Sequence, residues 1–189
     1  MSCKTSVFIA TSLDGFIARK DGSIDWLHSA NARVPSDEDC GYNAFIDSVD
    51  VLVIGRNTYE LSLTFPQWPY GSKRVVVLSS RSVRIPSEVS EIVSASSEAP
   101  ADLVRRLSSQ AATHLYIDGG VTIQRFLEAG LIDELTITVI PVLLGEGRSL
   151  FGPLGGDIRL THVSTKAYEF GYVQNRYRVT KDVLTTSPV

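Results

Sequence analysis

Cysteine, histidine and long hydrophobic runs are scarce in this sequence, and each scarcity excludes a class of site. The 189 residues include two cysteines, Cys3 and Cys40, and three histidines, which lie far apart at positions 28, 114 and 162. These residues cannot form a disulfide framework or a four-sulfur zinc site, so we expect no metal. No hydrophobic run reaches membrane-spanning length, and the N-terminal apolar stretch is too short and too interrupted for a signal peptide. We therefore expect a cytoplasmic protein with reduced thiols and no membrane partner.

An excess of basic residues is also missing. The sequence has 18 Lys and Arg against 21 Asp and Glu, which gives a formal net charge of -3. Without a broad basic surface we expect no nucleic-acid partner, although a few arginines could still bind a small anionic cofactor. The chain is 43% hydrophobic and long enough to close a core around a cleft, so we expect a single domain over residues 1–189.

Short apolar runs alternate with amphipathic segments over the first two thirds of the chain. The runs at residues 7–10, 51–54, 75–78 and 115–117 predict buried strands. Helices are predicted between them, starting near residues 36–39 and 58 and spanning residues 101–109 and 122–129. After residue 132 only strands are predicted, at residues 134–140, 158–166 and 172–180. This order predicts an α/β fold, with a mixed, mostly parallel sheet flanked by helices and an antiparallel C-terminal part.

Four loops that follow predicted strands carry residues typical of ligand sites, at 10–15, 55–58, 78–81 and 118–122. In open α/β sheets, ligands bind beyond the carboxyl ends of the strands. The segment from Gly55 to Thr58 would offer backbone N–H groups and the charge of Arg56 to a phosphate. The glycine pair at 119 and 120 would let a second helix start approach the same ligand. Together with Ser80 and Arg81, these loops predict a dinucleotide with an extra 2′-phosphate.

Each of these motifs also has a purely structural interpretation. Neither glycine segment is G-x-G-x-x-G or a Walker P-loop, and glycine between a strand and a helix is common in α/β proteins. The segment from Ser79 to Arg81 is typical of a solvated turn. The prediction of a cofactor site therefore depends on the four loops lying together.

The four segments together carry a family resemblance. The order VFIATSLDGFIA, VDVLVIGRNTYE, VVVLSSR and LYIDGGVTIQRFLEAGLIDELTITVIPVLLGEGRSLF resembles the dihydrofolate reductase superfamily. It is most similar to the reductase domain of the bifunctional riboflavin-biosynthesis deaminase-reductase and its stand-alone relatives. The resemblance implies a dihydrofolate-reductase-like fold and NADPH as cofactor. It also implies hydride transfer to a small-molecule substrate, a pterin- or riboflavin-precursor-like heterocycle, similar to 5-amino-6-(5-phosphoribosylamino)uracil reductase.

The resemblance also implies which residues contact the cofactor. Ala10 and Ile17 match the nicotinamide contacts, and Trp26 matches the aromatic residue of a mobile loop that closes over the site. The residues that match the phosphate, adenosine, pyrophosphate and nicotinamide contacts are Gly55, Arg56, Asn57, Thr58, Leu78, Ser79, Ser80, Arg81, Gly119, Gly120, Val121, Thr122 and Ile123.

The substrate side is less clearly defined by the resemblance. Folate-reducing members use one helix carboxylate as the proton donor, and Asp39 lies at a comparable place, although Asp37 and Glu38 are alternatives and an acidic first turn is typical of a helix cap. Asp14 and Asp118 are candidate substrate contacts, and Asp118 is equally compatible with a helix cap. Residues 61–71 contain no Arg or Lys, which disfavours a phosphorylated substrate. The H-x-E and P-C-x-x-C signatures of the upstream deaminase are missing from the sequence.

Two other functions stay open at this point. One is a non-catalytic regulatory module that binds NADPH, and the other is a true dihydrofolate reductase. We also expect a homodimer, because residues 135–142 and 145–151 carry more apolar surface than one sheet edge needs.

Overall fold

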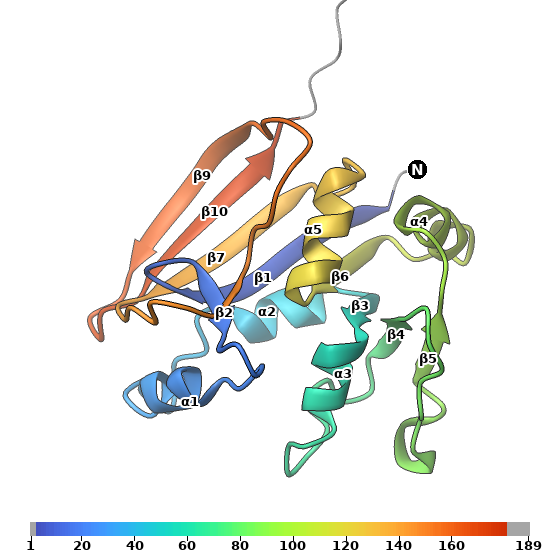
Figure 1. The fold of residues 1–189 in the computed structure, drawn as a ribbon, viewed down its shortest axis with the longest axis horizontal. Coiled ribbons are helices and arrows are strands. Elements are labelled where there is room, and N and C mark those ends of the chain that lie inside the picture. Colours follow the sequence, from blue (N-terminus) through green and yellow to red (C-terminus); the bar gives the residue numbers. More distant parts are fainter. Residues whose placement is uncertain (1–2, 181–189) are drawn as a thin grey trace, which may run out of the picture.

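The structure is a computed structural model that describes residues 3–180. Its centre is an eight-stranded sheet with the order β5-β4-β3-β6-β1-β7-β10-β9 (Figure 1). These strands are β1 (Lys4–Ser12), β3 (Val51–Gly55), β4 (Arg74–Leu78), β5 (Val93–Ser96), β6 (His114–Asp118), β7 (Glu134–Ile140), β9 (Leu160–Ala167) and β10 (Val173–Val179). A second, small sheet pairs β2 (Phe16–Ala18) with β8 (Arg148–Ser149) in antiparallel fashion.

Strand direction divides the large sheet into two parts. From β5 to β7 all neighbours are parallel, whereas β10 pairs antiparallel with both β7 and β9. In β3 the residues from Val51 to Ile54 are all buried, as expected for a parallel strand that is covered on both faces. The predicted fold class, a mixed and mostly parallel sheet with an antiparallel C-terminal part, is confirmed.

Five helices flank the sheet: α1 (Asp25–Asn31), α2 (Tyr42–Asp47), α3 (Arg56–Ser62), α4 (Pro100–Ser109) and α5 (Gly120–Glu128), with a short 3-10 helix η1 (Ser87–Val89). Leu107 of α4 and Phe126 of α5 pack with Ile117 in one core cluster. Tyr59 of α3 packs in a second cluster with Leu52. Because Leu52 and Val53 alternate between these clusters, the helices cover opposite faces of the sheet. None of the helices within residues 3–180 is long and apolar enough to cross a membrane.

Some elements differ from the sequence prediction. The helix expected from residue 36 begins at Tyr42, because Cys40 and Gly41 have φ values of 54° and 79°, which a right-handed helix does not accommodate. The helix α1, the strand β5 and the small β2–β8 sheet were not predicted. These elements are so short that their apolar residues do not show the periodicity of a helix or a strand.

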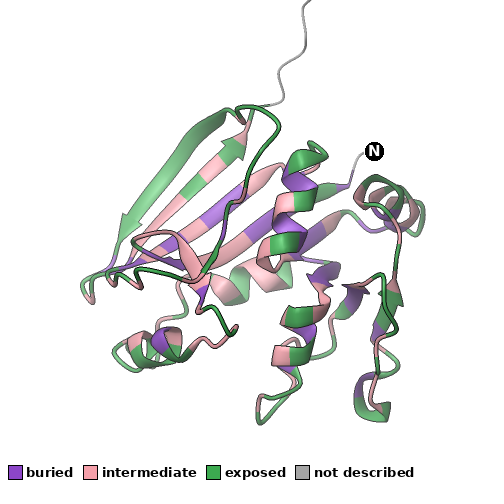
Figure 2. Ribbon diagram, in the orientation of Figure 1, coloured by how far each residue is buried: buried purple, intermediate pink, exposed green. Residues whose placement is uncertain are grey.

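The strand β7 lies inside the sheet, between β1 and β10. Leu135 and Ile140 are 1% and 2% exposed, so the apolar residues of β7 are used in the core. One edge of the sheet is β9, in which every residue is exposed (Figure 2). The homodimer stays a prediction: of the two segments on which it depends, β7 is used in the core, whereas Phe151 in the second is 44% exposed.

Candidate functional site

A cleft of about 910 Å³ opens at the carboxyl edge of the parallel strands. It forms there because β4, β3, β6 and β1 are neighbours that point the same way, so the loops that follow them meet. The lining residues that were predicted to bind the cofactor are Ala10, Ile17, Gly55, Arg56, Asn57, Thr58, Leu78, Gly119, Gly120, Val121 and Thr122. The structure thus brings together residues from all four predicted loops.

Five residues predicted to contact the cofactor do not line this cleft. Ile123 lies on the buried face of α5, in the hydrophobic core. Trp26 is 5% exposed and packs with Ile140, Tyr168 and Tyr172. Its indole Nε1 is buried and has no hydrogen-bond partner in the described part of the chain.

The other three residues outside the lining follow β4. The Ser79 hydroxyl donates to the Arg81 carbonyl at 2.7 Å and accepts from the Arg81 N–H at 3.0 Å. These bonds make residues 79–81 a tight turn, which is the purely structural interpretation that the sequence also allowed. Ser80 and Arg81 are exposed, next to Leu78, which does line the cleft. The turn therefore borders the cleft without forming its wall.

The starts of α3 and α5 are packed against each other at the cleft, and glycine permits this approach. A Cβ on Gly119 would lie 2.5 Å from Thr58 Oγ1, and one on Gly55 would lie 2.7 Å from Thr122 Oγ1. Gly119 also has a φ of 91°, a conformation that other residues rarely adopt. The backbone N–H groups that begin both helices, together with the Thr58 hydroxyl, are therefore concentrated beside one space, which suits an anionic ligand.

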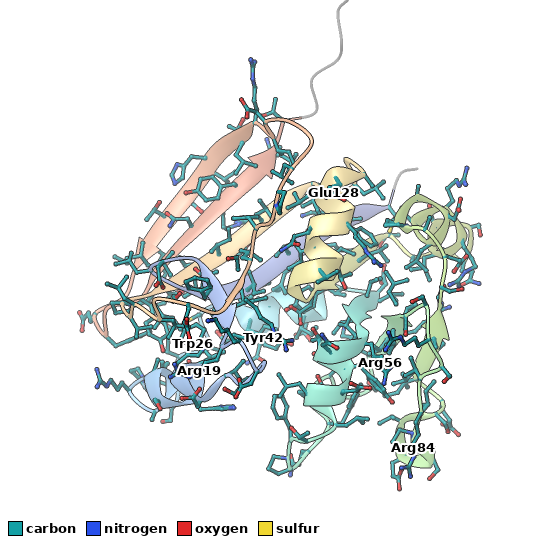
Figure 3. All side chains as sticks on the ribbon, in the orientation of Figure 1. Arg19, Trp26, Tyr42, Arg56, Arg84 and Glu128 are labelled. Carbon is teal, nitrogen blue, oxygen red and sulfur yellow. The ribbon has the colours of Figure 1, made fainter. Side chains whose placement is uncertain are left out.

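Arg56 brings positive charge to this end of the cleft. It lies on the side of α3 that faces β4 and β5, away from Trp26 and α1 (Figure 3). Its Nε donates to Glu60 Oε1 at 2.6 Å in an i,i+4 ion pair, and its side chain is 38% exposed. Glu60 orients the guanidinium and offsets part of its charge.

Asp118 ends β6 and also lines the cleft. Its Oδ1 accepts a hydrogen bond from the Gly119 N–H at 2.8 Å. Burial raises the pKa of the Asp118 carboxyl to about 6, although the Gly119 N–H lowers it. A carboxyl group that titrates close to neutral pH inside a cleft can both bind and release a proton.

Three tyrosines surround Asp118 on the α2 and α3 side of the sheet. Tyr42, Tyr70 and Tyr116 each interact electrostatically with the Asp118 carboxyl, and burial raises the pKa of all three phenols, that of Tyr42 to about 12. The Tyr116 hydroxyl donates to the Phe8 carbonyl at 2.7 Å, and the Tyr70 hydroxyl lies 3.2 Å from Ser62 Oγ. The phenols are neutral at physiological pH, so they neither repel the Asp118 carboxylate as anions nor compensate its charge.

Asp39 and Asp14, the predicted proton donor and a predicted substrate contact, lie outside the cleft lining. Asp39 is exposed, and its carboxylate accepts hydrogen bonds from the N–H groups of Gly41 at 2.7 Å and Asn43 at 2.8 Å. These bonds lower the pKa of Asp39 and make it a cap for α2, the alternative that its sequence position also allowed. Asp14 is bound by backbone N–H groups of the loop after β7.

Several residues that line the cleft were not predicted from the sequence. Ile24, Leu27, Leu61, Phe65 and Tyr70 form an apolar wall contributed by α1 and by the end of α3. They left only a weak signal, an aromatic-rich stretch after the Gly-Arg segment. The other lining side chains that were not predicted are Ile9, Ala18, Ser62, Gln124, Arg125, Arg148, Ser149, Phe151 and Pro153. Among residues 3–180, no group of His, Cys, Asp or Glu is arranged to hold a metal ion.

Comparisons with known proteins agree with this architecture. The family described as the RibD C-terminal domain matches residues 4–174. The uncharacterized protein YwjB of Bacillus subtilis (strain 168) is 36% identical over 170 residues, which cover 89% of this chain and 94% of that protein. A solved structure from Shewanella sp. PV-4, of a protein provisionally assigned to riboflavin biosynthesis, is 41% identical with a TM-score of 0.87 and covers 96% of this chain and 100% of that one.

More distant structures share the fold. The dihydrofolate reductase of Enterococcus faecalis, solved with NADP(H) and RAB-propyl, has a TM-score of 0.62 at 18% identity, covering 96% of this chain and 100% of that one. A deaminase and 5-amino-6-(5-phosphoribosylamino)uracil reductase of Thermotoga maritima has a TM-score of 0.72 at 13% identity, covering 95% of this chain and 57% of that one. The resemblance inferred from the sequence is confirmed: this chain belongs to the family of the RibD C-terminal domain and has a reductase-like fold of the dihydrofolate reductase type.

Proposed function

We propose that this chain is an NADPH-dependent reductase that transfers hydride to a C=N or C=O bond of a small pterin- or riboflavin-precursor-like heterocycle. The observation that carries the proposal is the cleft itself. Its lining combines two helix starts and Arg56, which suit phosphates, with an apolar wall and a carboxyl group with a raised pKa. The family match and the Enterococcus faecalis dihydrofolate reductase solved with NADP(H) support the choice of cofactor.

The residues at the phosphate end suit a dinucleotide. Thr58, Thr122 and the N–H groups that begin α5 would hold the pyrophosphate, and Arg56 would supply the positive charge. Because Gly55 and Gly119 have no Cβ, Thr122 packs closely on Gly55 and Thr58 packs closely on Gly119. Ala10 and Ile17 would contact the nicotinamide, and Ser80 and Arg81 the 2′-phosphate. NADPH, when bound, supplies the hydride.

Asp118 is the proton donor in this proposal. Reduction of C=N or C=O adds a hydride to carbon and requires a proton on nitrogen or oxygen. The Asp118 carboxyl, with its pKa raised to about 6 by burial, retains part of its protonated population near neutral pH and lies in the cleft wall beside Gly119. Asp39 cannot serve this role from its position as the cap of α2.

The wall formed by β2 and β8 would exclude water during hydride transfer. Ile17 and Ala18 of β2 line the cleft together with Arg148 and Ser149 of β8, and β2 pairs with β8. Water exclusion protects the transferred hydride and strengthens hydrogen bonds inside the site. We place this enzyme in the cytoplasm, since Cys3 and Cys40 are free thiols and reduced thiols are typical of that compartment.

Calorimetric titration of the purified chain with NADPH and NADH tests the proposal. We expect NADPH to bind with micromolar or tighter affinity and NADH to bind about tenfold more weakly, because a charge-assisted contact to the 2′-phosphate is lost. Binding of neither nucleotide would overturn the proposal. Oxidation of bound NADPH when an aminouracil or a dihydropterin is added would separate an enzyme from a non-catalytic module.

A further inference from the structure

Two hydroxyl groups, those of Ser62 and Tyr70, meet in the wall of the cleft. Both residues line the cleft. Ser62 is the last residue of α3, and Tyr70 lies in the connection between α3 and β4. Their oxygens are hydrogen-bonded at 3.2 Å. The direction of this bond decides what the Tyr70 hydroxyl can offer to a ligand.

The backbone of α3 determines that direction. The Ser62 hydroxyl donates to the Thr58 carbonyl at 2.8 Å, one turn earlier in the helix. Because a serine hydroxyl has a single hydrogen, Ser62 Oγ can then only accept from its other neighbours. Tyr70 is therefore the donor to Ser62, and its hydrogen is already used. The Tyr70 oxygen keeps the capacity to accept one more hydrogen bond.

Aromatic packing holds the Tyr70 ring in place. The ring lies edge to face on Trp68, with 5.1 Å between centroids, and Trp68 lies edge to face on Tyr59, with 6.1 Å between centroids. Tyr59 is buried, and its hydroxyl donates to the Arg84 carbonyl at 3.1 Å. This packing fixes the position of the Tyr70 oxygen at the wall of the cleft.

Asp118 brings a second acceptor to the same cleft. Its carboxyl group lines the cleft and interacts electrostatically with Tyr70. Its Oδ1 accepts from the Gly119 N–H at 2.8 Å. With a pKa of about 6, the carboxyl is mainly ionised at neutral pH, and an ionised carboxyl only accepts hydrogen bonds. At neutral pH the Tyr70 oxygen and the Asp118 carboxylate are therefore both acceptors.

We propose, on the basis of the reductase function above, that Tyr70 determines substrate specificity as a hydrogen-bond acceptor, and that Ser62 imposes this role by accepting the Tyr70 hydrogen. The matching substrate is a nitrogen heterocycle whose amino or ring N–H groups donate to Tyr70 and to Asp118. A carbonyl oxygen placed at Tyr70 would face another acceptor with no hydrogen between them, which costs affinity.

A matched pair of ligands tests this inference. Pterin and lumazine are planar bicyclic heterocycles of the same size, and one amino group of pterin is a carbonyl group in lumazine. The chain is saturated with NADP+, and calorimetry at neutral pH measures the affinity for each compound. We expect pterin to bind about tenfold or more tightly than lumazine, because lumazine replaces a donor with an acceptor.

Ser62→Ala tests the direction of the hydrogen bond. Without Ser62 Oγ, the Tyr70 hydrogen is free to bond to a ligand carbonyl, so this variant should bind lumazine about tenfold more tightly than the wild type does. A merely structural role of Ser62 would not produce such a gain. Ser29→Ala is the matched control, since the Ser29 hydroxyl also donates one turn back in a helix, to the Asp25 carbonyl at 2.9 Å. It should leave both affinities unchanged.

Tyr70→Phe tests the acceptor itself. Removing the Tyr70 oxygen should reduce the preference for pterin over lumazine severalfold, while the affinity for NADPH stays within error. Tyr59→Phe is the matched control, because it removes a phenol hydroxyl from the same aromatic group at a residue that does not line the cleft. It should keep the preference of the wild type.

The outcomes separate the two proposals. If NADPH does not bind, the reductase function fails and the role of Tyr70 fails with it. If NADPH binds but lumazine binds as tightly as pterin, or neither compound binds, the function stands and the role of Tyr70 is overturned. The role is also overturned if Ser62→Ala gains no affinity for lumazine, or if Tyr70→Phe keeps the full preference for pterin.

Discussion

The Asp14 carboxylate accepts a hydrogen bond from the backbone N–H of Gly145 at 2.7 Å, which joins the loop after β1 to the loop after β7. The same carboxylate accepts from the Leu144 N–H at 3.1 Å and from the Ser12 hydroxyl at 2.6 Å. Ser12 in turn accepts from the Phe16 N–H at 2.9 Å, at the start of β2. Asp14 thus joins the two loops that carry β2 and β8, which form one wall of the cleft; we call this set of hydrogen bonds the Asp14 latch.

Replacing Asp14 with alanine should loosen this wall. We expect faster hydrogen exchange at the amides of Leu144 and Gly145, a lower Tm and a severalfold weaker affinity for NADPH, because two backbone donors lose their acceptor. Asp21→Ala is the control, since Asp21 accepts only from within its own loop, from the Ser23 N–H at 2.8 Å. Unchanged exchange at Leu144 and Gly145 in the Asp14 variant would show that the latch does not hold the loops together.

The rate of reduction should depend on the protonation of Asp118. Because burial raises the pKa of this carboxyl to about 6, kcat/KM should fall about tenfold per pH unit above that value. In Asp118→Asn the rate should be lower and this pH dependence should be absent. The pH range from about 5 to about 8 extends one unit below and two units above the expected midpoint. If kcat/KM of the wild type does not change over this range, Asp118 is not the proton donor.

The same group makes a stability prediction with a defined sign. A carboxyl whose pKa is raised on folding binds its proton more tightly in the folded chain, so stability is lost as the pH rises from 3.8 towards about 6. Asp118→Asn should therefore stabilise the chain at pH 8 by up to about 3 kcal/mol and have little effect at pH 4. Urea unfolding of both proteins at the two pH values measures this difference. Equal changes at both pH values would contradict it.

Gly119 should tolerate no side chain. Its φ is 91°, and a Cβ would lie 2.5 Å from Thr58 Oγ1, so Gly119→Ala should cost more than the ~1–3 kcal/mol of backbone strain alone and should weaken NADPH binding. Gly130→Ala is the matched control, because Gly130 has a φ of 64° and nothing within 4 Å of its Cβ position. It should cost about 1–2 kcal/mol and leave the affinity for NADPH unchanged. Denaturant unfolding and calorimetry report the two effects, and equal losses in both variants would rule out a steric role for Thr58.

Arg81 tests the choice between the two nicotinamide nucleotides. Arg81→Gln should weaken NADPH binding about tenfold, the value of one charge-assisted contact to phosphate, and should leave NADH binding unchanged. Arg84→Gln removes a charge from the same segment and serves as the control. If both arginine variants bind NADPH like the wild type, the 2′-phosphate lies elsewhere, and Arg56 becomes the residue to change next.

The homodimer stays a prediction, and the edge strand β9 is one surface that a second copy could cover. Every residue of this edge strand is exposed, and Val163 is 44% exposed. Edge strands leave unpaired backbone groups that a second copy can pair. We expect the wild-type chain to sediment at twice its chain mass and Val163→Lys to sediment as a monomer. Glu91→Lys, near the opposite edge strand β5, should not change the mass. A monomeric wild type would refute the prediction.

Local sequence patterns predicted most of the sheet and the part of the cleft that follows β3 and β6. The β-branched runs at Val51 and Val75 give buried parallel strands, and glycine directly after a strand marks the helix starts at Gly55 and Gly119. The burial of Asp118 could not be predicted in this way. Asp39 and Asp118 were both compatible with a helix cap in the sequence, and only the tertiary structure leaves the first in solvent and buries the second.

Non-local pairing explains the other differences. The β2–β8 sheet joins Phe16 to Ser149 and Ala18 to Arg148, and neither short segment shows a period of its own. The apolar wall of the cleft likewise combines α1 with residues after α3, where the His28 and Phe65 rings contact each other.

The latch between Asp14 and Gly145 restricts how members of this family can be recombined. Residues 12–24 and 141–153 are joined by the Asp14 hydrogen bonds and by the pairing of β2 with β8. A chimera that takes residues 12–24 from a relative without a carboxylate at this position would leave the N–H groups of Leu144 and Gly145 without their acceptor. Grafting both at once should transfer the substrate preference of the donor protein without disturbing the sheet beneath.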